Sequence, residues 1–296
     1  MAFGMIKKAV IPAAGFGTRM LPAAKAIPKE MLPIIDRPTI QYVIEEAAEA
    51  KLSEIILINS RGKKATEEHF AANDELDKRL KGDKAKLLAS LKDLSQRVAI
   101  TSVIQEQQLG LGDAVGQARH AVGDEAFLCM LGDTVFSGEP SPARQLVEAY
   151  QRLGTSVIGL EEVPAEKVSR YGIVGGNLIG DGVMKLDRIV EKPELAAAPS
   201  RLAVAARYVL TPGIFACLNE TQAGKGGEIQ LTDAIALLMK REAVHGVLLK
   251  ARRHDIGNPV DWLKTNLIFA KRDPAMWKAI MPTLRELLEG KEELTK

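Results

Sequence analysis

A glycine-rich loop followed by cations is the strongest chemical signal in the sequence. Residues 12–19 read P-A-A-G-F-G-T-R, and their small side chains let backbone N–H groups approach phosphate oxygens closely. Arg19, Lys25 and Lys29 then place three cations within one stretch of loop. The prolines at positions 22, 28 and 33 restrict that loop and would hold the cations in place. These features predict a binding site for a phosphate-bearing ligand.

Two familiar phosphate-binding motifs do not fit this loop. A dinucleotide-binding fingerprint would need a third glycine where this sequence has Met20, and the Walker motif G-x-x-x-x-G-K-[S/T] does not occur. The loop therefore favours neither a Rossmann dehydrogenase nor a P-loop enzyme. A glycine-rich turn after a strand can also be purely structural, so the cations that follow it carry the functional interpretation.

The side chains that usually act as nucleophiles or bases are scattered. We expect the four histidines to be surface or packing residues, and we keep only His254, beside Asp255, as a candidate for chemistry. Cys129 lies in an apolar run, which predicts a buried and reduced thiol. Neither Cys129 nor Cys217 has the spacing of a metal site.

The elements that must position these residues alternate between strand and helix in the first half of the chain. Apolar runs there predict strands, and amphipathic runs between them predict helices. Alternation of this kind indicates a doubly wound, mainly parallel sheet of the α/β class. The expected strands are residues 9–11, 55–58, 98–104 and 127–131, and the expected helices are residues 39–50, 114–121 and 141–153. Residues 73–96 are highly charged and predict a surface pair of helices with one buried leucine stripe.

The second half is richer in strands and glycine turns, which predicts a mixed sheet. The expected strands are residues 155–163, 172–174, 183–191, 204–210 and 244–249, with turns at 175–177 and 180–182 and helices at 229–242, 258–273 and 274–288. The net charge of +2 favours neither nucleic acid nor a membrane as a partner. The sequence shows no signal-peptide pattern and no apolar stretch of membrane-spanning length, so we expect a cytoplasmic protein.

Several motifs, in this order, resemble the sugar-nucleotide pyrophosphorylases, and the bacterial UTP–glucose-1-phosphate uridylyltransferases in particular. The resemblance covers residues 7–266. It rests on G-x-G-T-R-x-x-P at residues 15–22, P-K-E-M-L-P at 28–33, Q-Y at 41–42, E-K-P at 191–193, R-Y-V-L at 207–210 and G-G-E-I-Q-L-T-D-A at 226–234. It implies a Rossmann-like nucleotide-diphospho-sugar transferase domain over residues 1–273, with a nucleotide part at about 1–135 and a sugar part at about 136–257. Residues 274–296 would form a helix for packing or oligomerisation.

The resemblance also implies roles for individual residues. Arg19 would bind the leaving pyrophosphate, Lys29 the phosphates during attack and Lys192 the sugar phosphate. Asp133, at the end of an apolar strand, and Asp255 would hold Mg²⁺, although either could instead cap a turn. Glu191 and Gly172 would contact the sugar. The uridine and phosphates would lie against Ala13, Ala14, Gly15, Gly17, Thr18, Glu30, Gln105 and Gly110. Gln105 could also simply face solvent.

The implied reaction joins UTP and glucose 1-phosphate into UDP-glucose and pyrophosphate, in a homo-oligomer such as a dimer or tetramer. A thymidylyltransferase, another sugar-1-phosphate nucleotidyltransferase and a non-catalytic nucleotide-sugar-binding regulatory protein remain alternatives. Three departures leave the preferred base and hexose open. Leu109 and Asp113 replace the lysine and histidine usual after the glutamine, and Ala206 replaces a glycine usual before Arg207.

Overall fold

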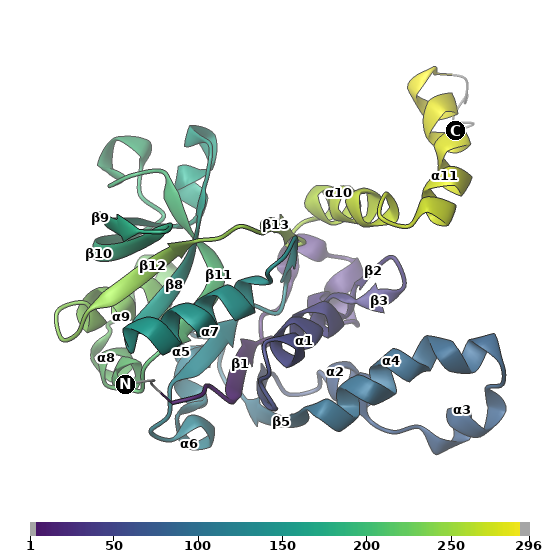
Figure 1. The fold of residues 1–296 in the computed structure, drawn as a ribbon, viewed down its shortest axis with the longest axis horizontal. Coiled ribbons are helices and arrows are strands. Elements are labelled where there is room, and N and C mark those ends of the chain that lie inside the picture. Colours follow the sequence, from purple (N-terminus) through teal and green to yellow (C-terminus); the bar gives the residue numbers. More distant parts are fainter. Residues whose placement is uncertain (1–3, 291–296) are drawn as a thin grey trace.

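The computed structural model describes residues 4–290, and a nine-stranded mixed sheet runs through its centre (Figure 1). Seven of the strands run in one direction, and β11 and β10 run opposite to them. In sheet order the strands are β5 (Ala99–Ile104), β4 (Glu54–Asn59), β1 (Lys8–Pro12), β6 (Phe127–Met130), β11 (Leu202–Leu210), β8 (Ser156–Glu162), β12 (Val244–Leu248), β10 (Val183–Glu191) and β9 (Gly172–Gly180).

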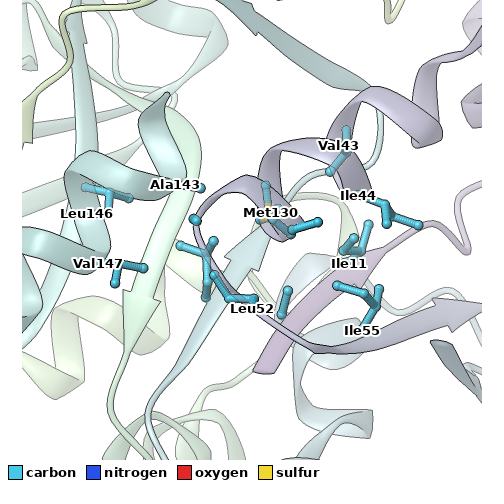
Figure 2. Close-up of a cluster of buried hydrophobic side chains, with 14 of the residues drawn as sticks. Ile11, Val43, Ile44, Leu52, Ile55, Met130, Ala143, Leu146 and Val147 are labelled. Atoms are coloured by element: carbon cyan, nitrogen blue, oxygen red, sulfur yellow. The ribbon is translucent and has the colours of Figure 1, made fainter. Parts of the chain in front are cut away.

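Helices cover both faces of the sheet because its central strands are apolar on both sides. The described helices are α1 (Thr39–Glu49), α2 (Ala65–Phe70), α3 (Asp74–Arg79), α4 (Asp83–Arg97), α5 (Leu111–Gln117), α6 (Arg119–Val122), α7 (Pro142–Leu153), α8 (Gly213–Glu220), α9 (Leu231–Leu238), α10 (Pro259–Ala270) and α11 (Pro274–Leu288). Ile11 and Ile55 belong to one apolar cluster that includes side chains of α1 and α7 on one face, as Figure 2 shows. Val10 and Ile56, one residue along each strand, pack against α5 and α9 on the other face.

Two short antiparallel ribbons lie outside the main sheet. One joins β7 (Thr134–Ser137) to β13 (Arg252–Asp255), and the other joins β2 (Pro33–Ile34) to β3 (Arg37–Pro38). In the first ribbon Asp255 pairs with Thr134, which directly follows Asp133 in the chain. This ribbon connects the end of β6 to the C-terminal helices.

The mixed, mainly parallel sheet and most of its expected elements are confirmed, with corrections in the second half. The turn expected at residues 175–177 is wrong, because those residues lie inside β9, where the pairing with β10 shifts register opposite Leu186 and Arg188. A bulge places glycines within a strand, and their local pattern looks like a turn. The helix expected at 229–242 is shorter, and the one expected at 114–121 is two helices, α5 and α6. Asp255 ends β13, a strand that the sequence analysis did not predict.

The charged stretch at residues 73–96 forms α3 and α4, as expected, but its leucine stripe is only partly buried. Leu94 is buried against the core next to α1, whereas Leu76 is 40% exposed. The stripe is therefore covered only where α4 approaches the sheet. At the other end of the chain, α11 has the expected bounds and no buried residue, and it points away from the sheet in Figure 1. Residues 291–296 of the expected C-terminal segment lie outside the described residues.

Candidate functional site

A cleft of about 860 Å³ opens where the parallel strands β1 and β6 end. This is the edge at which open α/β sheets place their ligands. All but one of the residues to which the family resemblance gives a role line the cleft, namely Ala14, Gly15, Gly17, Thr18, Arg19, Lys29, Glu30, Gln105, Gly110, Asp133, Gly172, Glu191, Lys192 and Asp255. Ala13 is buried behind them, and Lys25 is not among the lining residues.

The backbone of the glycine-rich loop is held from behind by Lys63. Its Nζ donates to the carbonyl oxygen of Ala13 at 3.0 Å and to that of Gly15. Gly17 has φ +65°, and a Cβ there would lie 3.2 Å from side-chain atoms of Ala24 and Lys29, so a glycine is required. Lys63 was not predicted at the site, because it stands in a polar loop after β4 whose composition is typical of a solvated segment. Its position at the end of a parallel strand was the available signal.

Lys29 and Asp133 form the central ion pair of the cleft. Lys29 Nζ lies 2.5 Å from Asp133 Oδ2. Burial alone would raise the pKa of Asp133, but the nearby charges of Lys29 and Arg19 outweigh it, and this pKa is lowered. Burial would lower the pKa of Lys29, but Asp133 and Glu30 outweigh it, and this pKa is raised. Both groups therefore stay charged at neutral pH, and the cleft presents a fixed carboxylate beside a fixed cation.

Arg19 and Asp255 complete this part of the cleft from two distant segments. A Cβ built on Gly257 would lie 3.2 Å from Arg19 Nη2 and 2.8 Å from Asp255 Oδ1, which places both side chains beside that glycine. Asp255 Oδ1 accepts a hydrogen bond from the Gly257 N–H at 2.7 Å. The β7–β13 ribbon keeps Asp255 next to the Asp133 loop, and Ile256 N–H donates to Asp133 O at 3.4 Å.

The donor set at this point fits a magnesium ion that also binds phosphate. Within residues 4–290 no three His, Cys, Asp or Glu side chains gather as a metal cluster. Two carboxylates from neighbouring strands are what Mg²⁺ uses when phosphates and water supply its remaining ligands. A dedicated protein cage for a metal ion is therefore not expected here, and Asp133 with Asp255 is compatible with a metal–nucleotide complex.

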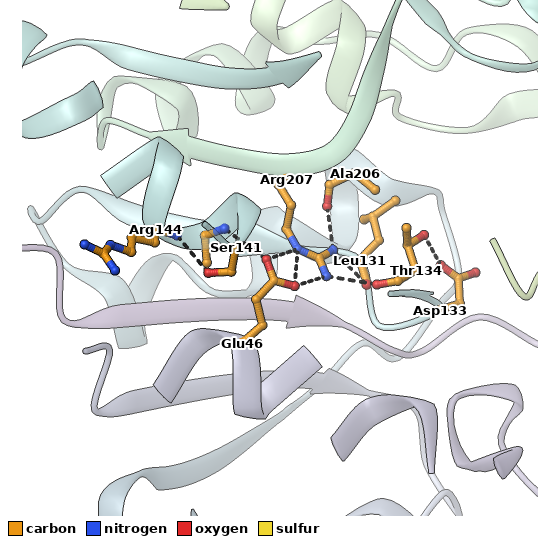
Figure 3. Close-up of polar contacts among 9 residues, drawn as sticks. Glu46, Leu131, Asp133, Thr134, Ser141, Arg144, Ala206 and Arg207 are labelled. Atoms are coloured by element: carbon orange, nitrogen blue, oxygen red, sulfur yellow. Dashed lines mark hydrogen bonds and ion pairs between the residues drawn. The ribbon is translucent and has the colours of Figure 1, made fainter. Parts of the chain in front are cut away.

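A buried arginine fixes the loop that carries Asp133 (Figure 3). Arg207 is fully buried, and its Nη2 donates to Thr134 O at 2.9 Å while its Nη1 donates to Leu131 O at 3.4 Å. The same guanidinium pairs with Glu46, with 2.7 Å between Nη2 and Oε2. Glu46 Oε1 in turn accepts from the N–H of Ala143 at the start of α7. The carbonyl groups on both sides of Asp133 are thus bound by one side chain. We refer to Arg207 and Glu46 as the buried pair.

The far end of the cleft has the residues expected at the sugar. Glu191 Oε1 lies 2.9 Å from Lys192 Nζ, and Glu191 Oε2 accepts from the Thr232 hydroxyl at 2.6 Å. A Cβ on Gly172 would lie 3.2 Å from Thr232 Oγ1 and 3.3 Å from Glu191 Oε2, so only glycine leaves these polar groups room. Arg253 also lines this end, over the ring of Tyr171 at 4.1 Å. Arg253 was not predicted at the site, because β13 has no apolar pattern that would mark it as a strand.

The opposite end contains Gln105, which does not face bulk solvent. Its side chain is 3% exposed, and Nε2 donates to Asp113 Oδ2 at 2.6 Å and to Gly110 O at 3.3 Å. The solvent-facing alternative is therefore wrong. Of the three residues that depart from the family pattern, Ala206 lines the cleft, whereas Leu109 and Asp113 do not.

The histidines and cysteines lie outside the lining of the cleft. His254 is buried, with its Nε2 2.7 Å from Ser137 Oγ and its ring edge against Phe269. Burial lowers the pKa of His254 to about 4, with Arg252 and Arg272 adding to the effect. His254 is thus a neutral packing residue. Cys129 is a buried free thiol, as expected, and Cys217 is also buried and free.

Comparison with known proteins gives consistent matches along nearly the whole chain. A family model described as nucleotidyl transferase matches residues 8–272. The chain is 44% identical over 291 residues to the UTP–glucose-1-phosphate uridylyltransferase of Bacillus subtilis, which covers 98% of this chain and 99% of the relative.

Solved structures give the same result. A UDP-glucose pyrophosphorylase complexed with UDP-glucose is 38% identical, with a TM-score of 0.85, over 91% of this chain and 100% of that one. A UTP-bound UGPase from Acinetobacter baumannii is 37% identical, also with a TM-score of 0.85, over 96% and 100%.

Proposed function

This chain belongs to the nucleotidyl transferase family, and we propose that it is a uridylyltransferase that makes UDP-glucose and pyrophosphate from UTP and glucose 1-phosphate. The observation that carries the proposal is the order of groups along one cleft. Gln105 follows β5 at one edge of the sheet, Asp133 follows β6 nearer its centre, and Glu191 ends β10 towards the other edge, and all three line the cleft. This order fits a base, a polyphosphate and a sugar phosphate. The names and ligands of the similar proteins support the same pair of substrates.

The reaction needs positioning and positive charge more than acid–base chemistry. A phosphate oxygen of glucose 1-phosphate attacks the α-phosphorus of UTP, and the bond from that phosphorus to the oxygen of the β-phosphate breaks. Pyrophosphate leaves with the electron pair of that bond. The attacking phosphate is already an anion at neutral pH, so no base is required. Fixed cations that reduce the repulsion between two polyanions supply most of the catalysis.

Each cation has a place in this scheme. Lys192, beside Glu191, would bind the phosphate of the sugar. Arg19 would bind the β- and γ-phosphates as they leave, and Lys29 would contact the phosphate at which attack occurs. The N–H groups of the loop around Gly15 would bind further phosphate oxygens, because Lys63 already holds the loop carbonyls on its own side.

Members of this family generally need a divalent metal ion, and we propose Mg²⁺ held by Asp133 and Asp255. A bound Mg²⁺ would neutralise charge on phosphate oxygens of UTP. Lys29 Nζ lies against Asp133 Oδ2 and would help to keep that carboxylate ionised, as the lowered pKa of Asp133 indicates.

The test is pyrophosphate release by the purified protein with Mg²⁺, UTP and glucose 1-phosphate. We expect release, together with formation of UDP-glucose and loss of activity with EDTA. A panel of triphosphates and sugar phosphates, compared by kcat/KM, separates this activity from a thymidylyltransferase or another sugar-1-phosphate nucleotidyltransferase. Tight UDP-glucose binding without turnover of any pair would instead indicate a regulatory protein.

The location and assembly of the protein also remain predictions. Among the described residues, no helix is both long and apolar enough to span a membrane. A cytoplasmic location and a homo-oligomer, dimer or tetramer, are part of the proposal. The unburied helix α11 is a natural contact surface for a second copy, and light scattering would measure the oligomer.

A further inference from the structure

We infer that Asp113 sets the nucleobase preference of the cleft by holding the Gln105 amide in one orientation. The inference rests on the proposed function, because it assumes that Gln105 faces the base of a nucleotide. Asp113 is not among the residues that line the cleft, so it acts through Gln105 as a positioning residue.

The orientation of the amide is fixed by the chemistry of its neighbours. Gln105 Nε2 carries two hydrogens, and two acceptors lie within reach, Asp113 Oδ2 at 2.6 Å and the Gly110 carbonyl oxygen at 3.3 Å. A rotation of the amide by 180° would place Gln105 Oε1 against a carboxylate and a carbonyl oxygen. Three acceptors would then face one another without a proton, which is costly in a buried position.

The amide oxygen is what remains for a ligand. Both hydrogens of Nε2 are directed to protein acceptors, and no donor among the described residues contacts Gln105 Oε1. Gln105 lines the cleft although it is only 3% exposed, so this oxygen is a nearly desolvated acceptor at the edge of the site. A nucleotide that supplies a donor there gains a hydrogen bond, and one that supplies an acceptor does not.

This polarity separates the pyrimidine bases. We place ring position 3 of the base against Gln105 Oε1. There uracil and thymine carry an N3–H donor, whereas cytosine has an unprotonated N3 that is an acceptor. At position 4 the preference would reverse, because cytosine has an amino donor there and uracil a carbonyl oxygen. A glutamine that could rotate would serve both kinds of base by presenting either its oxygen or its nitrogen. Asp113 removes this freedom, so the cleft should accept UTP and dTTP and reject CTP.

Asp113 is itself held in place. It lies in the first turn of α5, where the helix N-terminus favours a negative charge. Its second oxygen, Oδ1, accepts from Gln117 Nε2 at 3.2 Å. Each oxygen of the Asp113 carboxylate therefore has one partner. Only Oδ2, which is bonded to Gln105, affects the group that Gln105 presents to the base.

The experiment compares kcat/KM for UTP, dTTP and CTP in the wild type, in Asp113→Asn and in Asp113→Leu. Asparagine keeps the shape of the side chain but can donate or accept, so it permits both orientations of Gln105. We expect the UTP to CTP ratio to fall by roughly tenfold or more in Asp113→Asn, mainly because CTP turnover rises, while the UTP to dTTP ratio stays constant. Asp113→Leu, which offers neither donor nor acceptor, should also lower the UTP to CTP ratio.

Gln117→Leu is the matched control, because it removes the other bond of the same carboxylate on the exposed side of α5, and its ratio should stay at the wild-type value. Calorimetric binding of UMP and CMP gives a readout that does not depend on turnover and should show the same change. The inference is overturned if wild-type protein uses CTP as well as UTP, or if both Asp113 variants keep the wild-type ratio. A wild type without turnover of any triphosphate would contradict the proposed function instead.

Discussion

Two pairs of opposite charges lie on either side of the loop between β6 and β7, and they differ in what surrounds them. On the inner side, the buried pair of Arg207 and Glu46 is surrounded by protein partners that bind both its donors and its acceptors. On the cleft side, Lys29 and Asp133 contact each other at 2.5 Å but also line open space. The inner pair is saturated, whereas the outer pair keeps positions for other ligands.

The difference assigns the two pairs separate tasks. A buried arginine with every donor bound to protein cannot serve a ligand, but it can fix backbone carbonyls, and those of Leu131 and Thr134 flank Asp133. A cation and a carboxylate at an open cleft can exchange partners when phosphate and metal arrive. Substitutions on the inner side should therefore reduce stability first, and substitutions on the cleft side should reduce activity first.

The largest expected effect is the loss of the inner arginine. Arg207→Met leaves the carboxylate of Glu46 buried without its partner, and we expect the free energy of unfolding to fall by about 3–5 kcal/mol. Urea denaturation measures it. The double variant Arg207→Met with Glu46→Met removes both charges and should regain about half of the loss or more. A double variant as unstable as the single one would show that the pair itself is not the cause.

On the cleft side, Asp133→Asn should affect catalysis and leave the fold intact. The expected decrease in kcat is about 10²–10³-fold, because a group that holds charge in the transition state is removed. The free energy of unfolding should fall by less than in Arg207→Met, because the side chains of Lys29 and Asp133 are 18% and 17% exposed and keep contact with water. Asp181→Asn, in the exposed turn between β9 and β10, is the control for the same chemical change. Wild-type turnover in Asp133→Asn would contradict the assignment of Asp133 as a metal ligand.

The pH dependence of stability should also come from the buried part of the molecule. Burial and Lys185 lower the pKa of His245, so the unfolded chain binds a proton at a higher pH than the folded chain. The same holds for His69 and His254, whose pKa values are also lowered by burial. Stability should then fall as the pH decreases below about 6.5, and each of these histidines contributes at most about 1.4 kcal/mol per pH unit. Asp133, with its lowered pKa, keeps its charge in this range and adds nothing to the slope.

Unfolding measured from pH 7 to 5 should show a smaller slope in His245→Gln than in the wild type. His120→Gln, at an exposed position of α6, should leave the slope unchanged. An equal slope in His245→Gln and wild type would show that a different group binds the proton.

The smallest expected effect concerns Ala206, which precedes Arg207 in β11 and lines the cleft. It is a non-glycine residue at φ +58°, a conformation that costs an L-residue about 1–2 kcal/mol. Ala206→Gly should raise the free energy of unfolding by about 1 kcal/mol, as thermal or urea unfolding would measure. Ala205→Gly is the matched control and should lower it, because position 205 has no such strain. A lower free energy of unfolding in Ala206→Gly would mean that the packing of the Ala206 methyl group stabilises the fold by more than the positive φ costs.

The sequence predicted both residues of the outer pair at the site, although not the contact between them, and it predicted no role for the residues of the inner pair. Lys29 and Asp133 stand beside local signals, a proline-restricted loop and the end of an apolar strand. The burial of Arg207 depends on Glu46, which is 161 positions away, and nothing local marks an arginine inside β11 as buried. The contact between Gln105 and Asp113 spans only 8 positions but depends on the turn between a strand and a helix.

Hydrophobic patterns predicted the strands and helices that have one apolar face. They did not predict elements without such a face. β13 has the sequence R-R-H-D, and its only partner within the described residues is β7, so no hydrophobic alternation marks it. At the glycines of β9 the error was the opposite one, because residues inside a strand were predicted as a turn. A bulge in a long hairpin has the same glycine-rich composition as a turn.

The pairing of β13 with β7 has a consequence for the order in which the protein acquires its properties during synthesis. Asp133 leaves the ribosome about 120 residues before Asp255, and at roughly 5–20 residues per second this separates the two carboxylates by about 6–24 s. The parallel strands β5, β4, β1 and β6 are complete by then, with the glycine-rich loop at their edge. A nascent chain therefore contains the glycine-rich loop, Lys29 and Asp133 well before it contains Asp255, the second of the two carboxylates that we propose as Mg²⁺ ligands.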